Sequence, residues 1–286
     1  MSLEGLNSLS ARVESAAELD DDARAALRSL ILTLADSKRV LGLRYSDRML
    51  GAPTLEAGIA ASSMAQDEWG HARLTYALLG DFGDDPKALE HERPAAEYRS
   101  HPALDAELGS WADFIACILL VDTSLVVQYG ALVESRYTPA HNRVQKMLDE
   151  ERFHFQYAAG WVRRMAAVPE VREELAASLA RYLPQALQWL GDDSGDTAGR
   201  LVGEGLVSAG PSTLRARFLS RVVPVLADAG LADGLGLERR DGGEWTIAQP
   251  LSFDGWDEST RRSGGSLDEV TAARARGDKN RALLLD

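Results

Sequence analysis

The sequence predicts an all-α protein built around a four-helix bundle, with additional C-terminal helices and a short irregular or two-stranded C-terminal segment. Apolar residues recur at helical spacing over about the first 230 of 286 residues, and capping residues separate the helical stretches. Two stretches carry a Glu and a His three residues apart, at Glu68 and His71 and again at Glu151 and His154. Residues three apart share a helix face, so each pair can direct a carboxylate and an imidazole at one point.

Capping residues delimit the first two long helices. Three aspartates at 20–22 supply an N-cap and first-turn acids for a helix expected over residues 22–49. A Gly-Ala-Pro-Thr turn leads into a second helix, which is expected to end at Gly80 because glycine favours a helix C-terminus. Residues 81–108 are polar, contain three prolines and are expected to be irregular.

The later helices have similar start signals. Ser110 opens a capping box for a third helix, and the Thr-Pro pair at 138–139 supplies an N-cap and an N1 proline for a fourth. A fifth helix is expected after Pro169. Shorter helices are expected over residues 196–208 and 212–229, the second of them kinked at Pro224.

The pattern changes toward the C-terminus, where a Gly-rich turn lies between two short stretches that favour strands. We therefore expect one helical domain over residues 1–260 and a polar tail over 261–286 that is free to be mobile. Within the domain, the expected parts are a core bundle over 22–166, additional helices over 169–230 and an irregular segment over 231–260.

Composition excludes several classes of protein. A net charge of −13 argues against general nucleic-acid binding, which requires a basic surface. The single cysteine, Cys117, excludes a disulfide framework and, with no signal-like segment over 1–15, favours a cytoplasmic location. The longest apolar run, 114–121, is far shorter than the roughly 20 residues of a membrane span, so no membrane association is expected.

Ionisable residues interrupt the apolar seam of each long helix at its middle. They are Lys38, Glu68 with His71, Asp122, and Glu151 with His154. In an antiparallel helical hairpin, residues equidistant from the turn lie at the same level. This places Lys38 opposite Glu68 and Asp122 opposite Glu151, in two hairpins of nearly equal spacing. Because burying a charge costs several kcal/mol unless it is paired, these groups are expected to form one central cluster.

The charges of the cluster leave two possibilities open. Three carboxylates and the Lys38 ammonium sum to −2. One divalent metal with neutral His71 and His154 would balance that charge, and so would two protonated imidazoles without metal. Asp36 is no ready substitute for a carboxylate at position 38, because two residues along a helix correspond to about 200° of rotation.

Five short motifs carry a resemblance to a known family. They are Ala-Pro-Thr-Leu at 52–55, Ala-Gln-Asp-Glu-Trp-Gly-His at 65–71, Trp-Ala-Asp at 111–113, Leu-Val-Asp at 120–122 and Asp-Glu-Glu-Arg-Phe-His at 149–154. In this order they resemble the ferritin-like large subunits of the bacterial phenylacetyl-CoA epoxidase, a multicomponent ring oxygenase of aerobic phenylacetate breakdown. The resemblance extends over roughly residues 25–260 and implies a ferritin-like bundle.

The family contains a catalytic di-iron subunit and a related structural subunit. The resemblance places Glu68, His71, Asp122, Glu151 and His154 at its metal-ligand positions, and it places Lys38 where the catalytic subunit has a first-helix Glu. This departure favours the structural, non-catalytic subunit, with a vestigial or single-metal site. The alternative is a ferritin-like oxygenase active in its own right, with one metal or an atypical two-metal site. The expected cofactor is therefore none or one divalent metal, with iron the first choice.

The resemblance also implies partners. These are a homologous catalytic subunit, a small accessory subunit and a reductase that carries flavin and iron–sulfur groups, while the acyl-CoA substrate is bound mainly by the catalytic partner. The chain itself has no Gly-rich phosphate loop and too few cysteines for an iron–sulfur cluster. Candidates for the subunit interface are Trp189, Trp245 and Trp256. The histidines outside the cluster, at 91, 101 and 141, are expected to be solvated.

Overall fold

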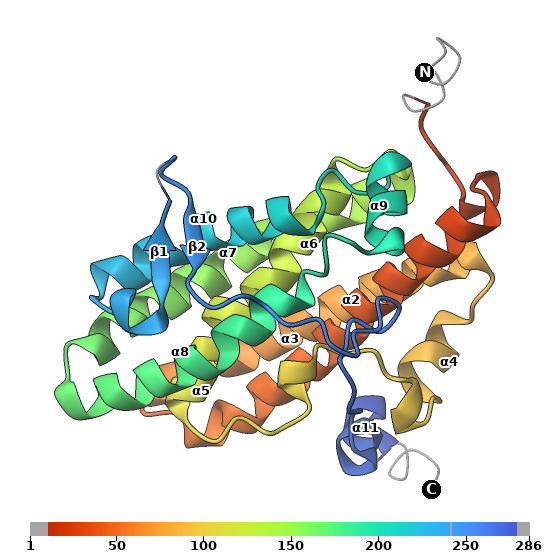
Figure 1. Cartoon of the computed structure of the whole chain (residues 1–286). Coiled ribbons are helices and arrows are strands. Elements are labelled where there is room, and N and C mark those ends of the chain that lie inside the picture. Colours follow the sequence, from red (N-terminus) through yellow and green to blue (C-terminus); the bar gives the residue numbers. More distant parts are fainter. Residues whose placement is uncertain (1–10, 241, 279–286) are drawn as a thin grey trace, which may run out of the picture.

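The computed structural model describes residues 11–240 and 242–278, and it confirms an all-α bundle with a short two-stranded C-terminal segment (Figure 1). Four long helical rods form the core. They are α2 (Asp21–Arg48), α3 (Leu55–Leu79), the continuous rod of α5 (Trp111–Ala116), a π-helical segment (Cys117–Asp122) and α6 (Thr123–Val133), and α7 (Thr138–Ala166).

The additional elements follow the core bundle in sequence. They are α8 (Pro169–Trp189), α9 (Asp196–Gly203), α10 (Pro211–Asp228), and the strands β1 (Leu237–Arg239) and β2 (Trp245–Ile247). The strands pair antiparallel, with Glu238 opposite Thr246. Pro224, where a kink was expected, lies inside α10.

Side-chain caps open three of the long helical rods, and the caps at Asp20 and Ser110 were predicted. Asp20 accepts a hydrogen bond from the Ala23 amide at 2.8 Å, Thr54 accepts one from Ala57 at 3.2 Å, and Ser110 accepts one from Asp113 at 3.2 Å. At α7 the expected position is wrong by one residue, because Tyr137 is the N-cap and Thr138 is already helical.

Close packing joins α2 and α3 into the first hairpin. Gly42 lies against the Trp69 indole, and a Cβ atom added at Gly42 would come within 2.6 Å of the ring. The absence of a side chain at this position lets the two helices approach each other. This contact fixes how α2 presents its other residues, including Lys38, to α3.

The third rod is more apolar than its short continuous apolar run indicated. By length and composition, Trp111–Val133 could cross a membrane, with a mean hydropathy of 1.8 over 18 residues. However, 94% of that window is buried inside the bundle, which is the position of a core helix. The expectation that no stretch approaches a membrane span in length and composition was therefore wrong. Asp113 and Asp122 interrupt the continuous apolar run, but the mean hydropathy of the stretch remains high.

The segment at 81–108, expected to be irregular, contains α4 (Pro86–His91) and short 3-10 turns. The buried Asp36 carboxylate holds this segment against α2. It pairs with the Arg93 guanidinium, accepts a hydrogen bond from the Arg99 amide at 2.8 Å, and accepts another from Tyr76 Oη at 2.5 Å. Asp36 thus points away from the central cluster, as its position on the helix predicts.

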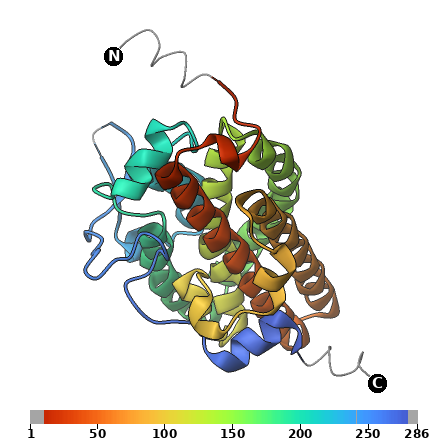
Figure 2. The same ribbon diagram turned by 90° about the vertical axis from the view of Figure 1, so that its right-hand side faces the viewer.

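The polar segment after residue 261 includes a helix that the sequence pattern did not predict, α11 (Glu269–Arg276). It packs beside α2 and α4 near one end of the bundle (Figure 2). Arg39 Nε donates to the Ala275 carbonyl at 2.6 Å, and Arg276 Nη1 donates to the Arg93 carbonyl at 2.8 Å. The part of the tail at 279–286 lies outside the described residues.

Two expectations about single aromatic residues were wrong. Trp189 is buried, with 1% of its surface exposed, so it cannot be an interface residue of the folded chain. His101 is fully buried rather than solvated, and its ring stacks on Trp189 with 5.2 Å between the ring centroids. His91 is half-buried and His141 is exposed.

Candidate functional site

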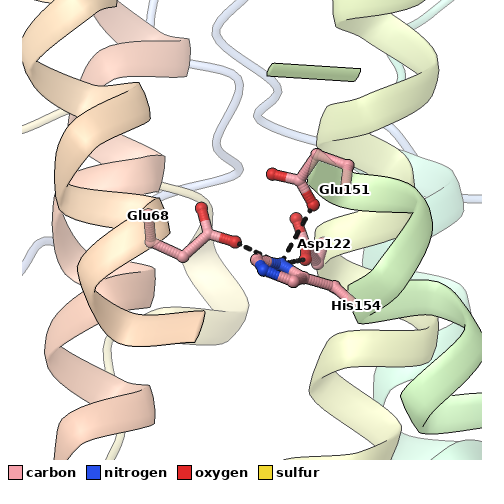
Figure 3. A group of neighbouring side chains, drawn as sticks. All are labelled: Glu68, Asp122, Glu151 and His154. Atoms are coloured by element: carbon pink, nitrogen blue, oxygen red, sulfur yellow. Dashed lines mark ion pairs between the residues drawn. The ribbon is translucent and has the colours of Figure 1, made fainter. Parts of the chain in front are cut away.

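The four rods bring six ionisable side chains together at mid-bundle. Helix α2 supplies Lys38, α3 supplies Glu68 and His71, the last position of the π-helical segment supplies Asp122, and α7 supplies Glu151 and His154. All six are buried, and none exposes more than 2% of its surface. Figure 3 shows four of them, with the acids directed toward the His154 ring.

The Lys38 ammonium lies among the three carboxylates. Its Nζ donates to Asp122 Oδ1 at 2.6 Å and to Glu151 Oε1, and it lies 2.8 Å from Glu68 Oε2. Lys38 therefore faces Glu68 across the first hairpin and also reaches the second hairpin. A single cation links the four helical rods.

The two histidines bridge α3 and α7 reciprocally. His71 on α3 contacts Glu151 Oε1 through Nδ1 at 3.0 Å and Glu150 Oε2 through Nε2 at 2.8 Å. His154 on α7 contacts Asp67 Oδ2 through Nε2 at 3.2 Å. Its Nδ1 lies 3.2–3.5 Å from oxygens of three acids, although the angles fall outside hydrogen-bond geometry. Those acids are Glu68, Asp122 and Glu151.

Asp67 and Glu150 are site residues that sequence reasoning missed. Each directly precedes the Glu of a Glu-x-x-His motif, and each contacts the outer nitrogen of the histidine on the opposite helix. The signal was present, because both motif copies read acid-Glu-x-x-His. Tyr45 was also missed; its Oη donates to Asp122 Oδ2 at 3.2 Å.

Burial and neighbouring charges set the protonation of the cluster. Burial alone would lower the pKa of Lys38, but the charges of Asp122, Glu151 and Glu68 outweigh it and raise the pKa well above the usual value. Burial likewise opposes protonation of both histidines, yet the surrounding acids raise the pKa of His71 and, much further, that of His154. Each imidazole thus binds its second proton more tightly than usual, which agrees with the carboxylate oxygens that face both of its ring nitrogens.

The pKa values of Glu68 and Glu151 shift in opposite directions. Burial would raise the pKa of Glu151, but Lys38 and the two histidines lower it well below its usual value. Burial, with the charges of Asp122 and Glu151, raises the pKa of Glu68 to about 7 despite the Lys38 charge. The difference agrees with the geometry, since neither Glu68 oxygen has a well-aligned hydrogen-bond donor among the described residues.

The donor set does not fit a two-metal centre. One ligand atom from each of Glu68, Asp122, Glu151 and His154 lies within 4.8 Å of the others, which is compact enough for one metal ion. However, the Lys38 ammonium already contacts three of these groups, and a protonated lysine has no lone pair for a metal. With both imidazoles protonated, three positive side chains would balance three ionised inner carboxylates without a metal. A second metal would also lack the first-helix carboxylate.

Two comparisons with known proteins found matches. The family model described as phenylacetic acid catabolic protein matches residues 3–247. A curated relative, one of the subunits of the 1,2-phenylacetyl-CoA epoxidase of Escherichia coli (strain K12), is 27% identical over 210 residues, which span 72% of this chain and 83% of the relative. The chain belongs to the phenylacetic acid catabolic protein family.

Proposed function

We propose that this chain is the structural, non-catalytic subunit of a phenylacetyl-CoA epoxidase-type ring oxygenase, and that it works in the cytoplasm. Its role is to pair with a homologous catalytic di-iron subunit. The family membership and the relative from the Escherichia coli epoxidase support a part in phenylacetate catabolism. The observation that carries the non-catalytic role is the Lys38 ammonium among Glu68, Asp122 and Glu151.

The chemistry of this arrangement is that of a structural core. An oxygen-activating di-metal site needs open coordination positions and ligands with free lone pairs. Here the inner carboxylates accept from an ammonium, and the outer imidazole nitrogens face Glu150 and Asp67. We infer that the cluster is a vestigial site in which an internal cation holds the four rods in place.

A second candidate function is a metal-dependent oxygenase active in its own right. One observation favours it, the compact grouping of Glu68, Asp122, Glu151 and His154. An iron ion bound there would supply dioxygen chemistry when present. For that ion to bind, the Lys38 side chain must leave the carboxylates, which makes this candidate the weaker one.

The proposed partners follow from the same interpretation. They are the catalytic subunit, a small accessory subunit and a reductase that carries flavin and iron–sulfur groups, with the acyl-CoA substrate bound mainly on the catalytic subunit. Reconstitution tests this assignment. The chain with the reductase, NAD(P)H and phenylacetyl-CoA should form no epoxide, and addition of the homologous catalytic subunit should start turnover. Epoxide formation by the chain and reductase alone would contradict the structural role.

A further inference from the structure

An apolar groove follows the turn between α2 and α3 and the outer face of α3. Its volume is about 610 Å³. It is lined by Met49, Leu50, Ala52, Thr54, Leu55, Gly58, Ile59, Ser62, Ser63 and Gln66. We call this set the α2–α3 groove.

The groove exposes large apolar side chains that the core does not use. The exposed fractions are 92% for Leu50, 78% for Leu55 and 61% for Ile59. Residues 49–66 contain one charged side chain, Glu56, in a chain in which 26% of residues are charged. Contiguous exposed apolar surface of this kind marks interaction sites on soluble proteins.

The shape of the groove suits a helix. Its α3 residues 55, 59, 62 and 66 recur at steps of three and four, which forms a ridge along one side of α3. Small side chains at Ser62 and Ser63 line the same face, so a helix backbone could approach closely, whereas Gly58 is buried and packs against the Met49 carbonyl of the turn. A ridge flanked by small residues is the surface into which a second helix packs.

Arg48 carries a positive charge beside the turn that borders the groove, where a Cβ atom added at Gly51 would come within 3.2 Å of Arg48 Nη2. The Arg48 Nε atom, one residue before Met49, is buried and has no hydrogen-bond partner among the described residues. No carboxylate within the described part of the chain lies within ion-pair distance of that guanidinium, whereas Arg44 and Arg274 nearby both pair with Asp47. A complementary ligand is therefore a helix that has an apolar face and an acidic side chain at one end of that face.

Another side of the bundle is already covered by the chain itself. The segment beyond the family match, after residue 247, crosses the bundle and ends in α11 against α2 and α4. Within this segment Arg262 pairs with Asp105, and Arg274 pairs with Asp47. A helix of a second protein would have to displace these contacts there, but it would displace none of them at the α2–α3 groove.

We propose that the α2–α3 groove is the docking surface for an amphipathic helix of the homologous catalytic subunit, with an acidic side chain of that helix paired to Arg48. The proposal rests on the proposed function for the identity of the partner. It moves the expected interface from Trp189, Trp245 and Trp256 to the first helical hairpin. The occupant is a helix rather than an extended peptide, because the groove follows one ridge of α3.

The test measures binding of the full chain to the purified catalytic subunit of the same organism, recognised by a glutamate at the position of Lys38. Ile59→Glu should weaken the complex at least 100-fold, because it places a charge in the apolar groove. Arg48→Gln should weaken it about tenfold and reduce its salt dependence. Val270→Glu is the matched control, since Val270 is 72% exposed on α11, and it should change the affinity less than threefold.

The possible outcomes separate this proposal from the proposed function. Unchanged binding by Ile59→Glu, with native circular dichroism, would overturn the groove proposal and leave the structural-subunit role intact. If the wild-type chain does not bind the catalytic subunit at all, the proposed function fails as well. If Ile59→Glu instead dissolves a self-associated dimer of this chain, the occupant is a second copy and the proposal is wrong.

Discussion

At the scale of single residues, the cluster depends on one ammonium that contacts three buried acids. Lys38 is fully buried and lies within 2.8 Å of Glu68 and Asp122 and in contact with Glu151. The three carboxylates offset the free-energy cost of burying the ammonium, and the ammonium does the same for the carboxylates. Removing the charge while keeping the volume would leave the acids unpaired in the core.

Lys38→Met should therefore destabilise the fold strongly. We expect the free energy of unfolding at pH 7.5 to fall by roughly 3–5 kcal/mol, the usual effect of removing one partner of a buried ion pair. Urea unfolding followed by circular dichroism measures the change. Lys87→Met, at an exposed position, is the control and should have little effect. Equal stability of the two variants would show that the acids do not depend on Lys38.

The buried His101 should make the free energy of unfolding depend on pH, independently of the central cluster. Burial, with the charges of Arg262 and Arg261, lowers its pKa to about 3, so the folded state keeps the imidazole neutral. In the unfolded chain, His101 binds a proton below its ordinary pKa of about 6.5. The free energy of unfolding should therefore fall as pH decreases from about 6.5 toward 3.

The measurement compares urea unfolding at pH 7.5 and pH 5. Wild type should lose about 2 kcal/mol more than His101→Asn over this interval, since asparagine does not titrate and can still accept from the Ala103 amide. His141→Asn, at an exposed position, should lose as much as wild type. If His101→Asn and wild type lose the same amount, His101 is not held neutral by the fold.

At the scale of elements, the helices that the sequence predicted are those with strong local signals. Asp20 and Ser110 cap helices as expected, α3 begins after the expected turn with Thr54 as its cap, and Gly80 follows the end of α3. The π-helical segment was missed because its extra residue leaves no local signature in a continuous apolar run. Helix α11 was missed because it is short and polar, and its position depends on contacts with α2 and α4.

The close packing of α2 against α3 depends on glycine at position 42, which has no side chain to collide with Trp69. Gly42→Ala should destabilise the protein by about 1–3 kcal/mol, because the added methyl group would collide with Trp69. Gly130→Ala is the matched control in α6, where nothing lies within 4 Å of the added atom, and it should stabilise by about 0.5–1 kcal/mol through helix propensity. Thermal unfolding measures both, and a stabilising Gly42→Ala would contradict the packing.

At the scale of the whole molecule, two helical hairpins face each other around one charged centre. The sequence predicted this because equal spacing placed Lys38 level with Glu68 and Asp122 level with Glu151. It could not predict the reciprocal contacts of His71 with Glu150 and of His154 with Asp67, which require the antiparallel contact between α3 and α7. Protonation of the cluster also depends on tertiary burial, which composition does not give.

We infer that the Lys38 ammonium replaces a bound cation, so the metal content of the chain should depend on residue 38. Wild type, Lys38→Glu and Lys87→Glu would be purified from iron-supplemented cultures, and iron and manganese per chain would be measured by mass spectrometry. With the ammonium in that role, we expect only trace metal in wild type and Lys87→Glu and about one or more ions per chain in Lys38→Glu. Stoichiometric metal in wild type, or no gain in folded Lys38→Glu, would contradict it.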